Sequence, residues 1–158
     1  MLLRGRQGTE LGLTLAGYQF PRELIDPWES NALLVEVRIV APEGSWDVVD
    51  PCLTTWEAAH VVAWLNALAR RADLVAARPL GVNAPNLTLI GHARRGEPDR
   101  VDVRACFALE RRPPWLAGAG GRNLCVDLDV ERAQLARAAH DLAADLATFP
   151  QRGDDPTL

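Results

Sequence analysis

The segment "LCVDLDV", residues 124–130, carries two acids that could do chemistry together. Asp127 and Asp129 are two positions apart, so a β-strand places both on one face. Paired carboxylates can act as general acid and base, or bind a hard divalent cation. The same alternation turns Leu124, Val126 and Leu128 toward a core and leaves the acids in solvent. We therefore interpret the acids as a solvated sheet face, with a small hydrolase that uses this carboxylate pair as the alternative.

A second candidate for chemistry is the thiol of Cys52, which lies just before a predicted helix. The positive end of a helix dipole lowers the pKa of a nearby thiol and so favours the nucleophilic thiolate. Catalysis also needs a base, and His60 lies about 9 Å along the helix axis from Thr54, at roughly 1.5 Å per residue. Cys52 is therefore better interpreted as a small buried hydrophobic residue, a common role of cysteine.

The histidines and cysteines as a group lack the spacing of a metal site or an activated nucleophile. The chain has three of each. They are His60, His92, His140, Cys52, Cys106 and Cys125. No phosphate-binding loop and no nucleophile-elbow motif occurs in a suitable setting. The sequence therefore predicts no catalytic residue, no metal site and no cofactor, and the widely spaced thiols favour a reducing compartment.

These residues are positioned by strands that come in pairs and by two helices. Alternating hydrophobic residues predict strands near 2–3 and over 10–20, 32–40, 45–49, 86–95, 100–110 and 124–130. Helical spacing predicts helices over about 55–71 and 130–148. Hairpins indicate an α+β domain, with a mostly antiparallel sheet of about six to seven strands and both helices packed on it. This single domain spans residues 1–150, and residues 151–158 are expected to form a disordered tail.

Local signals mark where the helices begin. Pro51 should stop a strand, because proline cannot donate to the ladder. Thr54 and Glu57 form an S/T-x-x-E capping box just before the first helix, which predicts a helix start there. On a helical projection Trp56 falls on the side away from the core. Asp129 is the expected N-cap of the second helix.

Composition excludes some classes of ligand. The 158 residues include 17 basic and 21 acidic side chains, for a formal net charge of −4, so the chain has no basic footprint for direct nucleic-acid binding. No segment offers the roughly 20 apolar residues that a membrane helix needs, and the amino terminus has no apolar signal region. We therefore expect a cytoplasmic protein that does not bind a membrane.

Two regions offer groups suited to protein recognition. Residues 21–31 contain two prolines and should form an exposed loop, and residues 41–44 should form a hairpin turn. Tryptophan is enriched in interface hot spots, and neighbouring acids suit a basic partner. The candidates for partner binding are Asp26, Trp28, Glu29, Glu43, Trp46 and Asp47. The competing interpretation is that the tryptophans belong to the core, as most do in a domain of this size.

Several short motifs stand out: "LAGYQFP" at 15–21, "N-x-LLVEV" at 31–37, "GSW" at 44–46 and "DPCLTTWE" at 50–57, with further support from "ALERRPPW" at 108–115 and the closing Phe149–Pro150. Together they resemble the WapI-type family of bacterial immunity proteins. The sequence departs from the family pattern at Ala32, where an aromatic residue often follows the asparagine. Cys52 is not a functional residue that the resemblance carries over.

The resemblance implies a small cytoplasmic protein without catalytic activity or cofactor. Such a protein binds and neutralises the toxic C-terminal domain of a contact-dependent toxin, which is a tRNA-cleaving nuclease in the example that names the family. The implied partner is thus a toxin nuclease domain, a class of protein that is commonly basic. A self-associating structural domain, whose sheet edge pairs with a second copy, is the remaining alternative.

Overall fold

The computed structural model describes residues 1–70, 79–82, 87–108, 113 and 123–156. These residues form two antiparallel four-stranded sheets and three helices. The first sheet has the order β1-β2-β3-β4, with bounds Leu2–Arg4, Glu10–Tyr18, Ala32–Ala41 and Gly44–Thr54. The second has the order β5-β6-β7-β8, with bounds Leu80–Val82, Leu87–Ala93, Arg100–Phe107 and Leu124–Glu131. The helices are α1 (Pro27–Asn31), α2 (Thr55–Arg70) and α3 (Arg132–Leu146).

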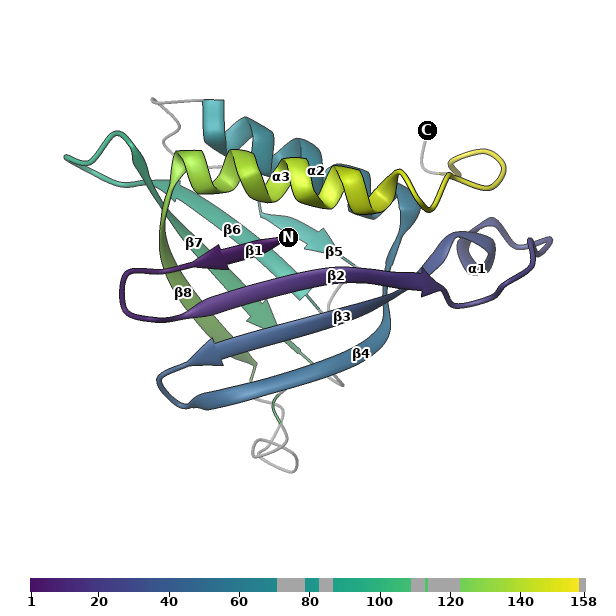
Figure 1. Cartoon of the computed structure of the whole chain (residues 1–158), viewed down its shortest axis with the longest axis horizontal. Helices are drawn as coiled ribbons and strands as arrows, with labels where there is room; N and C mark the ends of the chain where they lie inside the picture. Colours follow the sequence, from purple (N-terminus) through teal and green to yellow (C-terminus); the bar gives the residue numbers. More distant parts are fainter. Residues whose placement is uncertain (71–78, 83–86, 109–112, 114–122, 157–158) are drawn as a thin grey trace.

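The two sheets and the two long helices enclose one core. In Figure 1 the β1–β4 sheet lies in front of the β5–β8 sheet, and α2 and α3 lie side by side across the top of both. Strand β1 contacts β8, so the sheets meet along that side. The predicted α+β class with antiparallel hairpins is confirmed. The strands are divided between two sheets of four. The sequence did not predict this division, because alternation identifies each hairpin but not which hairpins share a ladder.

Aromatic and aliphatic side chains join the layers. The ring of Trp46 on β4 meets the ring of Phe107 on β7 edge to face, with 5.7 Å between centroids, and both side chains are buried. Helix α2 packs closely over β6 at Gly91, where an added Cβ would lie 2.7 Å from the side chain of Leu68. The missing side chain at Gly91 therefore admits the helix to the sheet.

The β3–β4 hairpin forms as predicted, with Gly44 at a φ of 145° in its turn. The expectation that Pro51 stops the second strand is wrong, because β4 continues to Thr54. The register shifts between the Leu33–Leu53 and Leu34–Pro51 pairs, which is a β-bulge. Strand β4 is an edge strand of its sheet, where a proline and a bulge are both tolerated.

The start of α2 confirms the capping box. The Thr54 N–H donates to Glu57 Oε2 at 2.8 Å, and the Glu57 N–H donates to Thr54 Oγ1 at 3.3 Å. Trp56, however, is buried rather than solvent-facing. The start of α3 also differs, because its N-cap is Glu131 and Asp129 belongs to β8. Ion pairs with arginines occupy the Asp129 carboxylate instead.

The cysteines differ from the expectation of three separate thiols. Cys106 and Cys125 are opposite each other in the β7–β8 ladder and form a disulfide. They are separated by 19 positions in sequence, so their pairing depends on the register of the two strands. Cys52 is buried, as expected. The cysteine content therefore no longer argues for a reducing compartment.

The segment from 21 to 31, expected as an exposed loop, contains a short helix and contacts the chain after Pro150. Helix α1 closes the segment, and Ser30 and Asn31 are buried. Arg152 is hydrogen-bonded to Asn31 and Phe20. Of the motif at 108–115, only Ala108 and Pro113 fall within the described residues. None of the helices in the described ranges combines the length and apolar character that crossing a bilayer requires.

Candidate functional site

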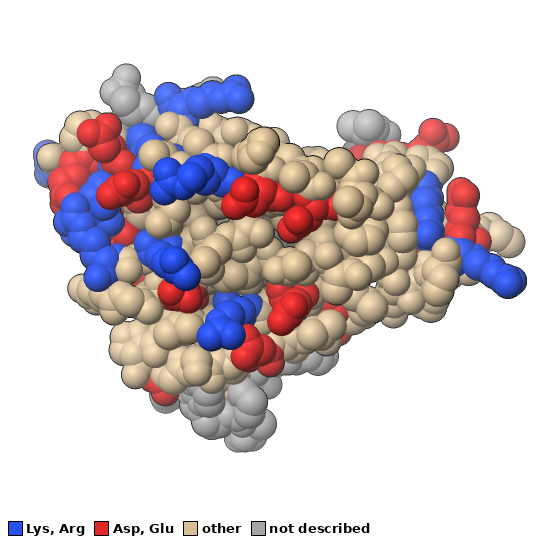
Figure 2. Space-filling model, viewed as in Figure 1, with Lys and Arg blue, Asp and Glu red and all other residues tan. Residues whose placement is uncertain are grey.

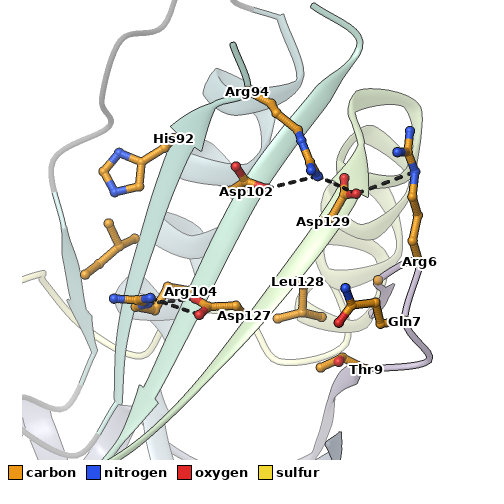
Figure 3. A pocket seen from close by; sticks show the side chains of 12 residues that line it. Arg6, Gln7, Thr9, His92, Arg94, Asp102, Arg104, Asp127, Leu128 and Asp129 are labelled. Atoms are coloured by element: carbon orange, nitrogen blue, oxygen red, sulfur yellow. Dashed lines mark hydrogen bonds and ion pairs between the residues drawn. The ribbon is translucent and has the colours of Figure 1, made fainter. Parts of the chain in front are cut away.

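A polar cleft of about 620 Å³ contains the two acids that first suggested chemistry. Its walls come from the β1–β2 turn and from β6, β7 and β8 (Figure 3). Asp127 and Asp129 lie on the same side of β8, as the alternation predicts, while Val126 and Leu128 are buried. Four arginines contact the two acids. We call these six residues the arginine–carboxylate cluster: Arg6, Arg94, Arg100, Arg104, Asp127 and Asp129.

Asp127 is held by Arg104, which lies directly opposite it in the β7–β8 ladder. The Arg104 guanidinium donates two parallel hydrogen bonds, Nε to Oδ1 at 2.7 Å and Nη2 to Oδ2 at 2.9 Å. These bonds hold the pKa of Asp127 below its usual value, against the opposing effect of partial burial. Asp127 is therefore a carboxylate at neutral pH, with both of its oxygens already bonded to a cation.

Asp129 is less exposed and has more partners. Arg100 donates to Oδ1, Arg94 Nη1 lies 2.5 Å from Oδ2, and Arg6 Nε lies 3.5 Å from Oδ2. Burial acts to raise the pKa of Asp129, but the hydrogen bonds from Arg100 and Arg94 outweigh it and lower the pKa overall. Because Arg6 belongs to the β1–β2 turn, Asp129 also ties the first sheet to the second.

This geometry neutralises charge rather than preparing acid–base chemistry. A general acid at neutral pH needs a raised pKa, whereas both carboxylates have lowered ones. Figure 3 shows Arg104 and Arg94 directed at the acids and the His92 ring directed away from them. His60, His92 and His140 are all exposed. The described ranges contain no group of three or more histidine, cysteine, aspartate or glutamate side chains that could hold a metal ion.

The six candidates for partner binding divide between two ends of the molecule. Asp26, Trp28 and Glu29 lie at α1, whereas Glu43 and Asp47 lie at the β3–β4 turn, on the opposite side in Figure 1. Trp46 also comes from that turn region, but its side chain is buried against Phe107 and belongs to the core.

At α1 the acids and the tryptophan have distinct positions. The Asp26 carboxylate caps the helix by accepting from the Trp28 N–H at 2.7 Å and the Glu29 N–H at 3.1 Å. Trp28 is 46% exposed, and its ring packs edge-on against buried Trp56, with 5.1 Å between centroids. Glu29 is exposed. At the other end, Asp47 is exposed, and its Oδ1 lies 3.8 Å from Nη1 of Arg38.

A buried amide holds α1 in place. Asn31 is completely buried, and its Nδ2 donates to Pro27 O at 2.9 Å and to Arg152 O at 2.7 Å. Its Oδ1 accepts from Thr55 Oγ1 at 2.8 Å and from the Arg152 N–H at 2.8 Å. Both donor and both acceptor positions of the amide are therefore used. Asn31 joins α1, the first residue of α2 and the carboxyl-terminal segment.

The side chain of Arg152 completes this support. Its guanidinium stacks 3.4 Å from the centroid of the Tyr18 ring. It donates to three backbone carbonyls, Phe20 at 2.9 Å, Ser30 at 3.3 Å and Pro21 at 3.1 Å. Tyr18 in turn packs against Phe149 and donates from its hydroxyl to the Pro150 carbonyl. Three motifs far apart in sequence, at 15–21, 31–37 and 149–150, thus meet at one end of the molecule.

We call this region the α1 end, defined as residues 20–31 with the supporting residues Tyr18, Thr55 and 149–152. Three of the sequence-based candidates, Asp26, Trp28 and Glu29, lie there, and so do Leu24 and Ile25, which were not candidates and are 37% and 104% exposed. A pair of large apolar residues between Pro21 and Pro27, in a segment with no strand or helix period, was the available signal. The supporting role of Asn31 had no such signal, because it depends on contacts with Thr55 and Arg152.

Comparison with known proteins identifies the family. The model of the immunity protein WapI-like family matches residues 1–150, which include both sheets, all three helices and the motifs gathered at the α1 end. No curated protein sequence and no solved structure matches the chain. Because the match extends over most of its length, the chain belongs to the immunity protein WapI-like family.

Proposed function

We propose that this immunity protein neutralises a nuclease-type toxin domain by binding it directly, without catalysis. The family match over residues 1–150 is the observation that carries the proposal. The mild acidity of the chain, −4 in formal charge, is consistent with a basic partner because opposite charges accelerate encounter. Neutralisation of an enzyme requires only that the inhibitor cover its active site or hold it in an inactive conformation.

The state of the two acids supports a binding role over the hydrolase alternative. Asp127 and Asp129 are each engaged by arginines and have lowered pKa values, so neither is poised to give or take a proton near pH 7. We therefore assign the arginine–carboxylate cluster to stability and expect an Asp127→Asn variant to protect cells as well as the wild type. Loss of protection in a variant that remains folded would favour the hydrolase instead.

We expect the reading frame immediately upstream of this chain's gene to encode the toxin domain, and the direct test uses that domain. We expect expression of that domain alone to stop growth, and co-expression of this chain to restore it. In solution, titration with the purified chain should abolish RNA cleavage at about one equivalent, which isothermal titration calorimetry should also give as the stoichiometry. Absence of both protection and binding would reject the proposal.

We also propose that the protein acts in the cytoplasm, where a nuclease toxin meets its RNA substrate. A disulfide such as Cys106–Cys125 is uncommon in that compartment. Alkylation of thiols in intact cells, followed by mass spectrometry, would report the state of these two cysteines in place. Fractionation that recovers the chain outside the cytoplasm would contradict this part of the proposal.

A further inference from the structure

We propose that the α1 end is the surface that docks the toxin domain. This inference rests on the proposed function and deepens it by naming the contact residues. Its centre is an exposed apolar patch made of Leu24, Ile25 and Trp28. The partner's complementary surface is an apolar socket with a basic rim.

The patch gathers most of the exposed large hydrophobic side chains in the described part of the chain. Ile25 is 104% exposed, Trp28 46% and Leu24 37%, whereas the other such side chain, Val49 at 63%, lies on β4. In Figure 2 charged side chains crowd the end of the molecule opposite α1, whereas the end that carries α1 shows fewer of them beside uncharged surface. Several exposed apolar groups in one short segment of a soluble protein are typical of an interaction site, whereas a single one such as Val49 is ordinary.

The backbone beneath the patch is held in one conformation. The Leu24 N–H donates to Ser30 Oγ at 3.0 Å, and the Ser30 N–H donates to Asp26 O at 2.9 Å. The Asp26 cap, the Asn31 amide and the Arg152 guanidinium fix the segment from below. A backbone segment that is already held in place costs less entropy to bind. A buried hydrogen-bond network therefore holds the backbone that exposes Ile25 to solvent. The Ile25 side chain makes no packing contribution to the isolated chain.

A groove beside the patch indicates the partner's chemistry. It has a volume of about 480 Å³, and Trp28 forms part of its wall together with Pro51 and Leu53. The carboxylates of Glu29 and Glu57 also line it. A groove that combines apolar walls with carboxylates suits the aliphatic stem and cationic head of a lysine or arginine.

The local charge agrees with this choice of partner. Residues 22–29 contain three acids, Glu23, Asp26 and Glu29, against the single arginine Arg22. The guanidinium of Arg152 is directed at backbone carbonyls rather than at these acids. A basic protein surface therefore meets an excess of negative charge around an apolar centre, the arrangement that steers a specific complex.

The β3–β4 turn is the competing surface, and its tryptophan is not available as an anchor. Glu43 and Asp47 are exposed there, but Trp46 is 5% exposed and packs in the core. Interfaces draw most of their binding energy from a few desolvated aromatic, aliphatic or arginine side chains. Charges alone at this turn would steer a partner weakly and would be screened by salt.

The test measures the affinity of the purified full chain for the upstream-encoded toxin domain by calorimetry. We expect Ile25→Ser to weaken binding about tenfold and Trp28→Ala about 30-fold or more, because each removes a side chain that the complex buries. Val49→Ser is the matched control, an exposed aliphatic residue of the same chain, and should change affinity by less than about twofold. Ile25 is fully exposed in the free chain, so Ile25→Ser leaves its fold intact even if Trp28→Ala does not.

A second pair of variants tests the basic rim. Glu23→Gln combined with Glu29→Gln should lower affinity about threefold at low salt, and the difference should shrink as ionic strength rises. Glu43→Gln combined with Asp47→Asn removes the same number of acids from the β3–β4 turn and should have no effect. The opposite result for the two pairs would move the docking surface to that turn.

The outcomes separate this inference from the proposed function. If the wild type does not bind the toxin domain, both fail. If the wild type binds and Ile25→Ser, Trp28→Ala and Val49→Ser bind equally well, the docking surface is wrong and the proposed function stands. Light scattering of the chain alone adds one further outcome: a dimer that Ile25→Ser dissociates would show that the patch is covered by a second copy, and would overturn the inference.

Discussion

The α1 end and the arginine–carboxylate cluster use polar side chains in opposite ways. At the α1 end a neutral amide, Asn31, is completely buried with all its hydrogen bonds made, and it holds apolar side chains out in solvent. In the cluster, charged side chains on the surface neutralise one another above a buried apolar core. A buried amide has no water to replace a lost bond, whereas an exposed ion pair exchanges its partner for solvent at little cost. The difference indicates that the conformation of the α1 end depends on its buried polar residues. In the cluster, only the less exposed acid, Asp129, is expected to contribute much to stability.

The largest expected effect is at Asn31. Asn31→Ala leaves Thr55 Oγ1 and backbone groups of Pro27 and Arg152 without their partner, and should lower the free energy of unfolding by about 3 kcal/mol. Denaturant unfolding followed by tryptophan fluorescence measures it. Asn66→Ala is the control, since Asn66 donates to Val62 O within α2. It should cost less than about 0.5 kcal/mol. Equal losses in the two variants would contradict the supporting role of Asn31.

The second effect is at Asp129, the less exposed acid of the cluster. Its side chain is 19% exposed and that of Arg100 is 10% exposed, so Asp129→Asn leaves a guanidinium with little access to water. We expect a loss of about 2 kcal/mol at pH 7, between the cost at a surface pair and that at a buried one. Unfolding in urea measures it. A loss no greater than that of Asp127→Asn would show that burial does not separate the two acids.

The pH dependence of stability follows from the same carboxylate. The folded pKa of Asp129 is below its unfolded value of about 4. The contribution of this carboxylate to the free energy of unfolding is therefore complete well above pH 4. It is lost as pH falls through the folded pKa, because the unfolded chain takes up the proton more readily. The wild type should therefore lose more stability than Asp129→Asn between about pH 5 and pH 2. Parallel curves for the two proteins would contradict the lowered pKa.

The third effect is at the capping box beside the α1 end. Thr54→Ala removes the hydroxyl that accepts from the Glu57 N–H, and should cost about 1 kcal/mol. Thr54→Ser keeps the hydroxyl and is the control. Thermal unfolding followed by circular dichroism measures both. If Thr54→Ser loses as much as Thr54→Ala, packing of the methyl group rather than the cap is responsible.

The smallest effect is at the exposed pair of the cluster. Asp127 and Arg104 are 65% and 52% exposed, so Asp127→Asn should change stability by about 0.5 kcal/mol or less, despite its two parallel hydrogen bonds. Unfolding at low and at high salt measures the remaining contribution, which should shrink with added salt. If Asp127→Asn lost more stability than Thr54→Ala, the expectation that this exposed pair contributes little would be wrong.

Much of the fold was predictable because its causes are local. The alternation in 32–40 and 124–130 specified β3 and β8, and the Thr54–Glu57 pattern specified the start of α2. The errors share a different cause. Trp56 was assigned to solvent although its ring meets that of Trp28, 28 positions earlier, and Asp129 was assigned to a cap although arginines from β7 and from the residue after β6 pair with it. In each case the deciding partner is distant in sequence.

The candidate site was predictable only in part for the same reason. The loop between Pro21 and Pro27 was identified, and with it Asp26, Trp28 and Glu29. The sequence did not predict which of the two candidate ends carries an apolar surface, because Trp46 and Trp28 have similar acidic neighbours in sequence. Only burial separates them, at 5% and 46% exposed.

The sequence by itself determined the hairpins, the two long helices and the resemblance to an immunity family, since period, caps and short motifs act over a few residues. The tertiary structure decided which side chains are available. It paired Cys106 with Cys125, neutralised Asp127 and Asp129 with arginines, and brought Asn31 to Arg152 so that Leu24, Ile25 and Trp28 face outward. The physical reason is that burial and charge pairing depend on residues brought together from distant parts of the chain, and such contacts exist only once the layers have packed.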